Sequence, residues 1–95
     1  MNIRFYMDPE TGLPHIYEHE VEEEEVRDIL RRPDDVQASD RKSKIAFGQT
    51  SSGRYLCVVY LRDPEPHSFF VVTAYELRGN DQKAFRRRRR KKRGT

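Results

Sequence analysis

The sequence contains little of what usually stabilises a very small protein. It has one cysteine, Cys57, and only 35% of its 95 residues are hydrophobic. A single cysteine excludes an intrachain disulfide framework and a cysteine-based zinc site. No hydrophobic run approaches the ~20 residues of a membrane-spanning helix, and no segment near the N-terminus has the pattern of a signal peptide. We therefore expect a cytoplasmic protein without membrane contact, in which Cys57 is a buried hydrophobic residue.

The charge of the chain is divided unevenly along its length. Residues 1–82 contain ten Lys and Arg against sixteen Asp and Glu, a net charge of −6, whereas residues 83–95 contain nine Lys and Arg and no acidic residue. This asymmetry is typical of an interaction segment attached to a folded body. We therefore predict a single domain over residues 1–82 and a basic C-terminal segment over residues 83–95. A core this small could also be supported by a homo-oligomer.

The hydrophobic pattern predicts one helix and four strands. Apolar residues at helical spacing, four glutamates at the start and Pro33 at the end predict a helix over residues 21–32. Alternating or continuous apolar runs predict strands over residues 3–7, 44–50, 54–62 and 68–77. The polar stretch before the second of these strands fits a loop or an edge strand.

Short turns join the last three predicted strands. We therefore predict an α+β fold: a small antiparallel meander of about four strands, one covering helix, and a basic C-terminal helix or tail. Five consecutive arginines repel one another and have no apolar neighbours after Phe85, so we expect the chain to fray beyond that residue.

The basic segment is the strongest functional feature of the sequence. Its side chains form an electrostatic footprint for phosphate groups, and a guanidinium group can bond phosphate oxygens in pairs and stack on bases. The candidate RNA-binding residues are Arg86, Arg87, Arg88, Arg89, Arg90, Lys91, Lys92 and Arg93. Two alternatives stay open: the segment could bind an acidic partner protein, or it could dock on the chain's own acidic residues 20–25.

Five further residues could carry chemistry if the strands bring them together. Cleavage of RNA by its own 2′-hydroxyl requires removal of a proton, stabilisation of negative charge on the phosphate and a proton donor for the leaving oxygen. Lys, Arg, Tyr and His supply these functions without a metal ion, and imidazole titrates near neutral pH. The catalytic candidates are His19, Lys44, Arg54, Tyr75 and Arg78.

A metal site receives less support from the sequence. His15 and His19 have the i, i+4 spacing that would place them on one helical face, but neither Glu18 nor Glu20 completes a known ligand pattern. The consecutive glutamates 22–25 point in different directions on a helix and cannot converge on one ion. We therefore expect neither a metal ion nor a cofactor.

Several short motifs, taken in order, resemble a known family. They are residues 5–8 (FYMD), 19–21 (HEV), 33–34 (PD), 45–48 (IAFG), 50–54 (TSSGR) and 70–74 (FVVTA). Their order and spacing resemble the BrnT-like branch of the RelE toxin superfamily, or its sister family of short uncharacterised RelE-like domains. Glu18 stands where BrnT-like proteins have a lysine, and Tyr75 where they have an arginine. The resemblance implies a RelE-like fold, an RNA substrate and an acidic antitoxin encoded by a neighbouring gene.

Two functional hypotheses follow. The first is the toxin of a type II toxin-antitoxin pair that acts on RNA, in its strongest form as a metal-independent endoribonuclease. Here Lys44, Arg54 and Arg78 would contact phosphate, and His19 or Tyr75 would move protons. The alternative is a non-catalytic binding module whose basic tail holds nucleic acid or an acidic partner protein.

Overall fold

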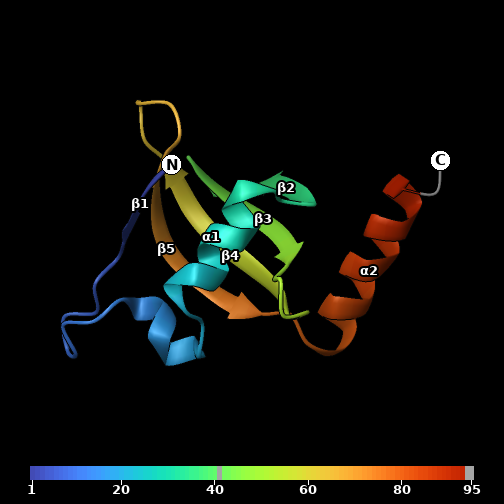
Figure 1. The fold of residues 1–95 in the computed structure, drawn as a ribbon, viewed down its shortest axis with the longest axis horizontal. Coiled ribbons are helices and arrows are strands. Elements are labelled where there is room, and N and C mark those ends of the chain that lie inside the picture. Colours follow the sequence, from blue (N-terminus) through green and yellow to red (C-terminus); the bar gives the residue numbers. More distant parts are fainter. Residues whose placement is uncertain (41, 94–95) are drawn as a thin grey trace.

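The structure, a computed structural model, describes residues 1–40 and 42–93, and the side chains of residues 92 and 93 lie outside its description. The elements in chain order are β1 (Asn2–Phe5), the 3-10 helix η1 (His15–His19), α1 (Glu23–Arg31), β2 (Asp35–Ala38), β3 (Ser43–Gln49), β4 (Tyr55–Arg62), β5 (Ser68–Glu76) and α2 (Gly79–Arg93). The prediction of an α+β fold is confirmed (Figure 1).

Within the described residues, the strands form one five-stranded mixed sheet in the order β1-β5-β4-β3-β2. Strands β2 to β5 pair antiparallel, as the predicted meander requires, but β1 pairs parallel to β5. The prediction of a four-stranded antiparallel meander was therefore wrong in strand number and in the direction of β1. The extra strand, β2, is short and mostly exposed, so its polar sequence fits an edge strand. The partner of β1 lies more than sixty residues away, and no local periodicity reports such a pairing.

Helix α1 covers one face of the sheet and belongs to the main core. Its buried side chains are Val26, Ile29 and Leu30, the residues that the helical spacing indicated. They lie in one cluster with apolar residues of β3, β4 and β5. Gly48 lets the helix approach β3 closely, because a Cβ atom there would lie 3.1 Å from Ile29 Cδ1.

The N-terminus of α1 begins with a capping box rather than at the predicted Val21. The Glu22 backbone N–H donates to Glu25 Oε1 over 3.0 Å, and the Glu22 side chain in turn caps the first turn. Val21 and Val26, which flank the box, are both fully buried in the main core. This arrangement corresponds to a hydrophobic staple and fixes the angle at which the chain enters the helix.

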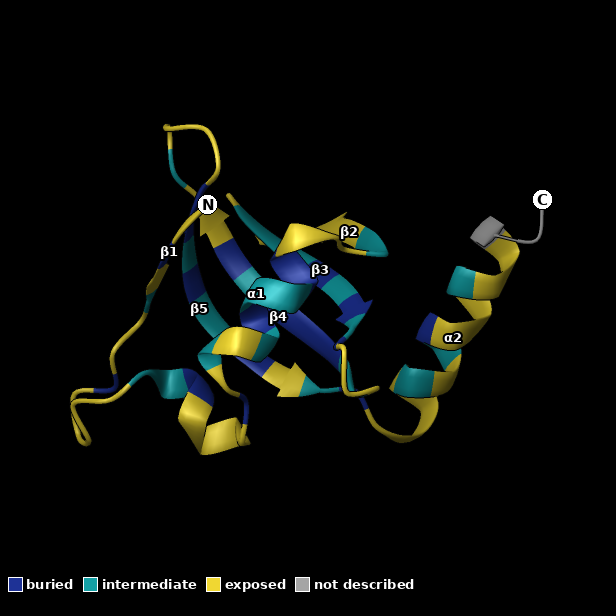
Figure 2. Cartoon of the chain, in the orientation of Figure 1, coloured by how far each residue is buried: buried dark blue, intermediate teal, exposed yellow. Residues whose placement is uncertain are grey.

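Helix α2 lies against the opposite face of the sheet, beside β3 and β4. Phe85 is fully buried with Cys57 and Leu77 and packs against the rings of Phe47 and Tyr55. Figure 2 shows the described part of α2 as mostly exposed, and Phe85 is its buried side chain. The expected burial of Cys57 is confirmed.

The basic segment is helical through Arg93. The sequence had predicted that the chain would fray beyond Phe85. The predicted division between residues 82 and 83 falls inside α2. The difference has a physical origin in tertiary contacts, since Phe85 and polar contacts from the arginines hold this helix against the sheet.

Candidate functional site

A shallow pocket lies where η1 meets the end of β5. Its lining residues are Glu18, His19, Glu20, Tyr75, Glu76 and Arg78. His19 ends η1, and Tyr75 lies near the end of β5; their ring centroids are 6.2 Å apart. The left-handed conformation of Glu20, with φ of 57°, ends the 3-10 helix and turns the chain back toward α1. Three of the five catalytic candidates thus share one pocket.

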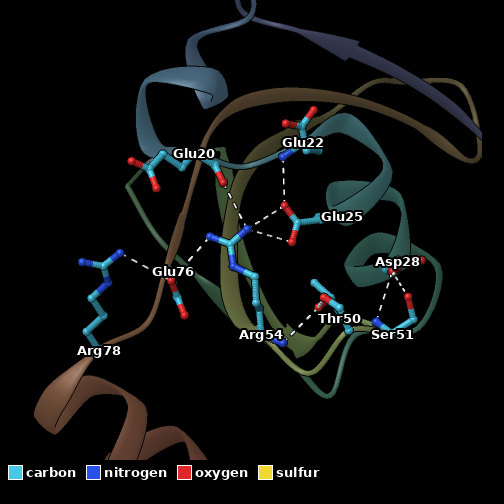
Figure 3. Close-up of polar contacts among 10 residues, drawn as sticks. Glu20, Glu22, Glu25, Asp28, Thr50, Ser51, Arg54, Glu76 and Arg78 are labelled. Atoms are coloured by element: carbon cyan, nitrogen blue, oxygen red, sulfur yellow. Dashed lines mark hydrogen bonds and ion pairs between the residues drawn. The ribbon is translucent and has the colours of Figure 1, made fainter.

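Arg54 lies next to this pocket at the start of β4 and is engaged by three segments of the chain (Figure 3). Its Nη1 donates to both carboxylate oxygens of Glu25 at 2.8 Å and to the Glu20 carbonyl oxygen at 3.0 Å. Its Nη2 lies 3.4 Å from Glu76 Oε1. The guanidinium group therefore joins α1, the end of η1 and β5 through both of its terminal nitrogens.

The environment of Arg54 keeps the guanidinium group charged. Partial burial acts to lower the pKa of Arg54, but the hydrogen bonds and charges of Glu25 and Glu76 outweigh it and raise the pKa. The side chains of Arg54 and Glu25 are 28% and 15% exposed, so the pair is partly shielded from water. The arrangement indicates that Arg54 organises the acidic side of the pocket rather than binding phosphate directly.

Glu76 connects Arg54 to Arg78. Its Oε1 lies 3.4 Å from a guanidinium nitrogen of each arginine, and both contacts are visible in Figure 3. The Arg78 side chain is 77% exposed and can turn from Glu76 to a ligand. Arg78 is therefore the cation of this pocket that is most accessible to an incoming phosphate.

Lys44 lies at the other end of the sheet. It is the second residue of β3 and pairs with Tyr60, whereas Tyr55, beside Arg54, pairs with the last residue of β3. These two positions of β3 are five residues apart, which separates them by about 17 Å at 3.4 Å per residue. The structure therefore brings together His19, Arg54, Tyr75 and Arg78, but not Lys44.

Tyr75 is held in its protonated form. Its interaction with Cys57, followed by partial burial, raises the pKa of Tyr75 to about 12. Burial is also the main cause that raises the pKa of the Cys57 thiol. At neutral pH the Tyr75 hydroxyl can donate a proton, whereas Cys57 remains a thiol and is a poor nucleophile.

A second candidate surface is the outer face of α2. Lys83, Arg86, Arg87 and Arg90 are exposed and line one shallow groove. Their i, i+3, i+4 and i+7 spacing places the four side chains on one side of the helix. The Arg86 guanidinium also lies 5.7 Å from the centre of the Tyr55 ring, so this basic surface continues to an aromatic side chain of the sheet.

The inner arginines of α2 have a different role. Arg89 Nη1 donates to Gln49 Oε1 over 2.7 Å, and Arg89 Nε lies 3.3 Å from Asp34 Oδ2. Arg88 lies over the Phe47 ring at 5.2 Å and 3.6 Å from Asp35. The segment therefore docks on Asp34 and Asp35, not on residues 20–25 as one alternative proposed. Lys91 is exposed and lines a groove beside these contacts, and the side chains of Lys92 and Arg93 lie outside the described residues.

The sequence did not predict the acidic residues that pair with Arg54 and with the inner arginines of α2. Glu76 is one charged residue at the end of an apolar strand, and no local pattern links it to Arg54. Asp34 and Asp35 had a detectable signal, because two acidic residues directly follow the helix-ending Pro33. That signal shows an acidic position but does not name the arginines that meet it.

Comparisons with known proteins do not relate the chain to a family or to a known structure. No family model, no curated protein and no solved structure matches the chain. Across the described residues, no helix combines the length and apolar character needed to span a membrane.

Proposed function

We propose that the protein binds RNA through the outer face of α2, with Lys83, Arg86, Arg87 and Arg90 as the phosphate contacts. One observation carries this proposal: four exposed cations share one face of a helix that the inner arginines already hold in place. A rigid basic surface loses less conformational entropy on binding than a disordered tail. Arg86 lies over the Tyr55 ring, and a base that displaced this guanidinium group could stack on the ring.

The proposal predicts a salt dependence that belongs to this face alone. If four phosphates of a single strand are contacted, log K against log salt has a slope of about −3, from ~0.7 counterions per phosphate. Replacing Arg87 and Arg90 by Gln together flattens that slope by about 1.4 on the same reasoning. The matched control is Arg31→Gln with Arg32→Gln, which removes the same charge from exposed residues at the end of α1.

The measurement is fluorescence anisotropy of a labelled single-stranded RNA at several salt concentrations. The proposal expects the α2 variant to lose affinity and slope, while the control keeps the slope of the original protein. Equal losses in the two variants would mean that net charge, not the α2 face, causes binding. Absence of binding at low salt would remove RNA as a ligand, and an acidic partner protein would then be the better candidate.

A second candidate function, metal-independent RNA cleavage by a toxin-like protein, has one specific observation in its favour. His19, Tyr75 and Arg78 line a single pocket. His19 would take the proton from the 2′-hydroxyl as its oxygen attacks phosphorus, and Arg78 would stabilise the added negative charge. Tyr75 would give its proton to the leaving 5′-oxygen, which leaves a 2′,3′-cyclic phosphate and a 5′-hydroxyl. Lys44 lies too far from this pocket to take part. Arg54 would position Glu76, which contacts Arg78.

Cleavage is tested separately from binding. Purified protein is incubated with single-stranded RNA, and His19→Gln and Tyr75→Phe are compared with His67→Gln, a histidine in the loop between β4 and β5. The candidate expects loss of the cyclic-phosphate product in the first two variants only. If RNA stays intact when incubated with the original protein, the cleavage hypothesis is wrong and the RNA-binding proposal is unaffected.

The toxin hypothesis has its own test in the cell. Inducible expression of the chain should arrest growth, and co-expression of an adjacent gene for an acidic antitoxin should restore it. An antitoxin of that charge would cover the same α2 face, so the Arg87 and Arg90 variant should also weaken its binding. Normal growth without the adjacent gene would contradict a toxin role.

A further inference from the structure

Three side chains of types that can bind a metal ion converge on the side of η1 that faces the N-terminal loop, and one of them, Glu18, also lines the pocket described above. Asp8 follows β1, and His15 and Glu18 lie on η1. His15 Nδ1 lies 3.6 Å from Asp8 Oδ2 and 3.6 Å from Glu18 Oε2. The three ligand atoms lie within 4.8 Å of one another. No step of the proposed RNA binding or cleavage uses them.

The backbone of the N-terminal loop fixes the first of these side chains. Asp8 Oδ1 accepts a hydrogen bond from the Glu10 backbone N–H at 2.8 Å. The Asp8 backbone N–H donates to the Leu13 carbonyl, and its carbonyl accepts from Gly12, which adopts a φ of 73°. Asp8 is only 8% exposed. One carboxylate oxygen is thus used by the loop, and the other is left facing His15.

The 3-10 geometry of η1 supplies the other two ligands. With about three residues per turn, side chains at i and i+3 lie directly above one another. His15 and Glu18 have this spacing, so both project to the side where Asp8 lies. In the sequence, His15 and His19 have the i, i+4 spacing of an α-helical face. Because η1 is a 3-10 helix, Glu18 at i+3 lies on the same side as His15 instead.

We propose that Asp8, His15 and Glu18 bind a divalent metal ion of the Zn²⁺ type. Tetrahedral zinc with bonds of 2.0–2.1 Å places its ligand atoms about 3.4 Å apart, and two of the three separations here are 3.6 Å. The imidazole nitrogen selects Zn²⁺ over Mg²⁺ and Ca²⁺, which prefer oxygen ligands. Three protein ligands leave one coordination position for water, on the side of the exposed Glu18.

The proposed metal site differs from the expectation of no metal drawn from the sequence. The missing ligand comes from a loop seven residues before His15, outside any helical spacing. Bound Zn²⁺ would connect this loop to η1, and η1 packs on β5. The proposal does not depend on RNA binding by α2, so the two can fail separately.

The test titrates the full chain with Zn²⁺ alone by calorimetry, without RNA. The proposal expects saturation at one ion per chain and a higher thermal midpoint with metal, because a ligand that binds only the folded state stabilises it. Co²⁺, bound in place of Zn²⁺, should give visible absorption bands typical of four-coordinate cobalt.

Matched variants separate this site from adventitious surface binding. His15→Gln and Glu18→Gln should each lower Zn²⁺ affinity by at least about tenfold, the scale at which altered metal surroundings usually act. The controls His67→Gln and Glu20→Gln remove the same groups elsewhere and should leave affinity within about twofold. Glu18 is partly exposed, so its variant is expected to fold even if the Asp8 loop is sensitive. Absence of stoichiometric binding, or equal losses in the controls, would overturn the metal site.

Discussion

The two helices of this protein cover opposite faces of one sheet in contrasting ways. Helix α1 inserts three buried apolar side chains into the main core and approaches β3 at Gly48. In the part of α2 whose side chains are described, Phe85 is the buried residue, and the other contacts with the sheet come mainly from arginines. In Figure 1, α1 lies across the front of the sheet, whereas α2 stands beside it, and Figure 2 shows the described part of α2 as largely exposed.

This contrast indicates that the two helices have different functions. Burial of an apolar side chain contributes about 1.5–3 kcal/mol, so α1 has about three times the hydrophobic anchoring of α2. The ion pairs of α2 add to this anchoring without matching it: the Arg88 and Asp35 side chains are 42% and 24% exposed, and those of Arg89 and Asp34 are 21% and 19% exposed. Helix α1 is therefore part of the fold, and α2 is an attached element whose outer charge is available for a partner.

The largest effect should come from introducing a charge on the α1 face of β4. Val58 is fully buried on that face, whereas its neighbour Val59 is half-buried on the α2 face. An unpaired buried carboxylate costs at least several kcal/mol, which approaches the whole stability of a small domain. Val58→Asp should abolish cooperative unfolding in circular dichroism, and Val59→Asp should lower the thermal midpoint but keep the transition. Equal losses of stability in the two variants would show that the two faces of β4 are equally shielded from water.

The second prediction compares one anchor from each helix. Ile29→Ala should cost about 2–5 kcal/mol of the global free energy of unfolding, as for other large-to-small core substitutions. Phe85→Ala should instead release α2, because that helix has no comparable second anchor among its described side chains. Amide hydrogen exchange should then rise in residues 79–91 and change little in β4. Loss of protection throughout the sheet would mean that α2 is part of the core.

An intermediate effect is expected at Arg54, which belongs to the α1 side. Arg54→Ala would leave Glu25 and Glu76 without their shared cation in a partly shielded position. We expect a loss of about 1–3 kcal/mol by chemical denaturation. Arg78→Ala, which removes a far more exposed partner of Glu76, should stay within about 0.5 kcal/mol. If the two variants are equally stable, Arg54 does not organise the α1 side, and its guanidinium is free to serve a ligand.

The sequence could predict what depends on local patterns. Val26, Ile29 and Leu30 showed the buried face of α1 by spacing alone, and the apolar runs located β3, β4 and β5. Pairing between distant segments left no such pattern. Residues 2–5 do not show that their partner is β5, and the short edge strand β2 looks as polar as a loop.

The functional residues divide in the same manner. The basic character of α2 is visible in composition, but which arginines face the sheet depends on Asp34, Gln49 and the ring of Phe47. The grouping of His19 with Tyr75 requires η1 to pack on β5, a contact between segments more than fifty residues apart. Lys44 was included because its strand was correctly predicted, although its position along that strand places it at the wrong end.

The smallest effect should come from a charged pair that touches neither helix, and it sets the baseline for the α2 ion pairs. Arg4 Nη2 donates to both carboxylate oxygens of Asp63 at 2.7 and 2.9 Å, and the Ser68 hydroxyl donates to the same group at 2.6 Å. The Ser68 and Arg4 hydrogen bonds lower the pKa of Asp63 in the folded protein. A lowered folded pKa stabilises the protein above the unfolded value of about 3.9, and that contribution is lost as pH falls through the folded pKa. Asp63→Asn should therefore be less stable than the original protein at pH 6, and the gap should close below pH 4. Asp34→Asn, measured in parallel by thermal unfolding, tests whether α2 docking exceeds this baseline; if its effect is no larger, Phe85 alone holds the helix. A gap between the Asp63 variant and the original protein that does not narrow as the pH falls below about 3.9 would mean that the side chain acts through packing rather than charge.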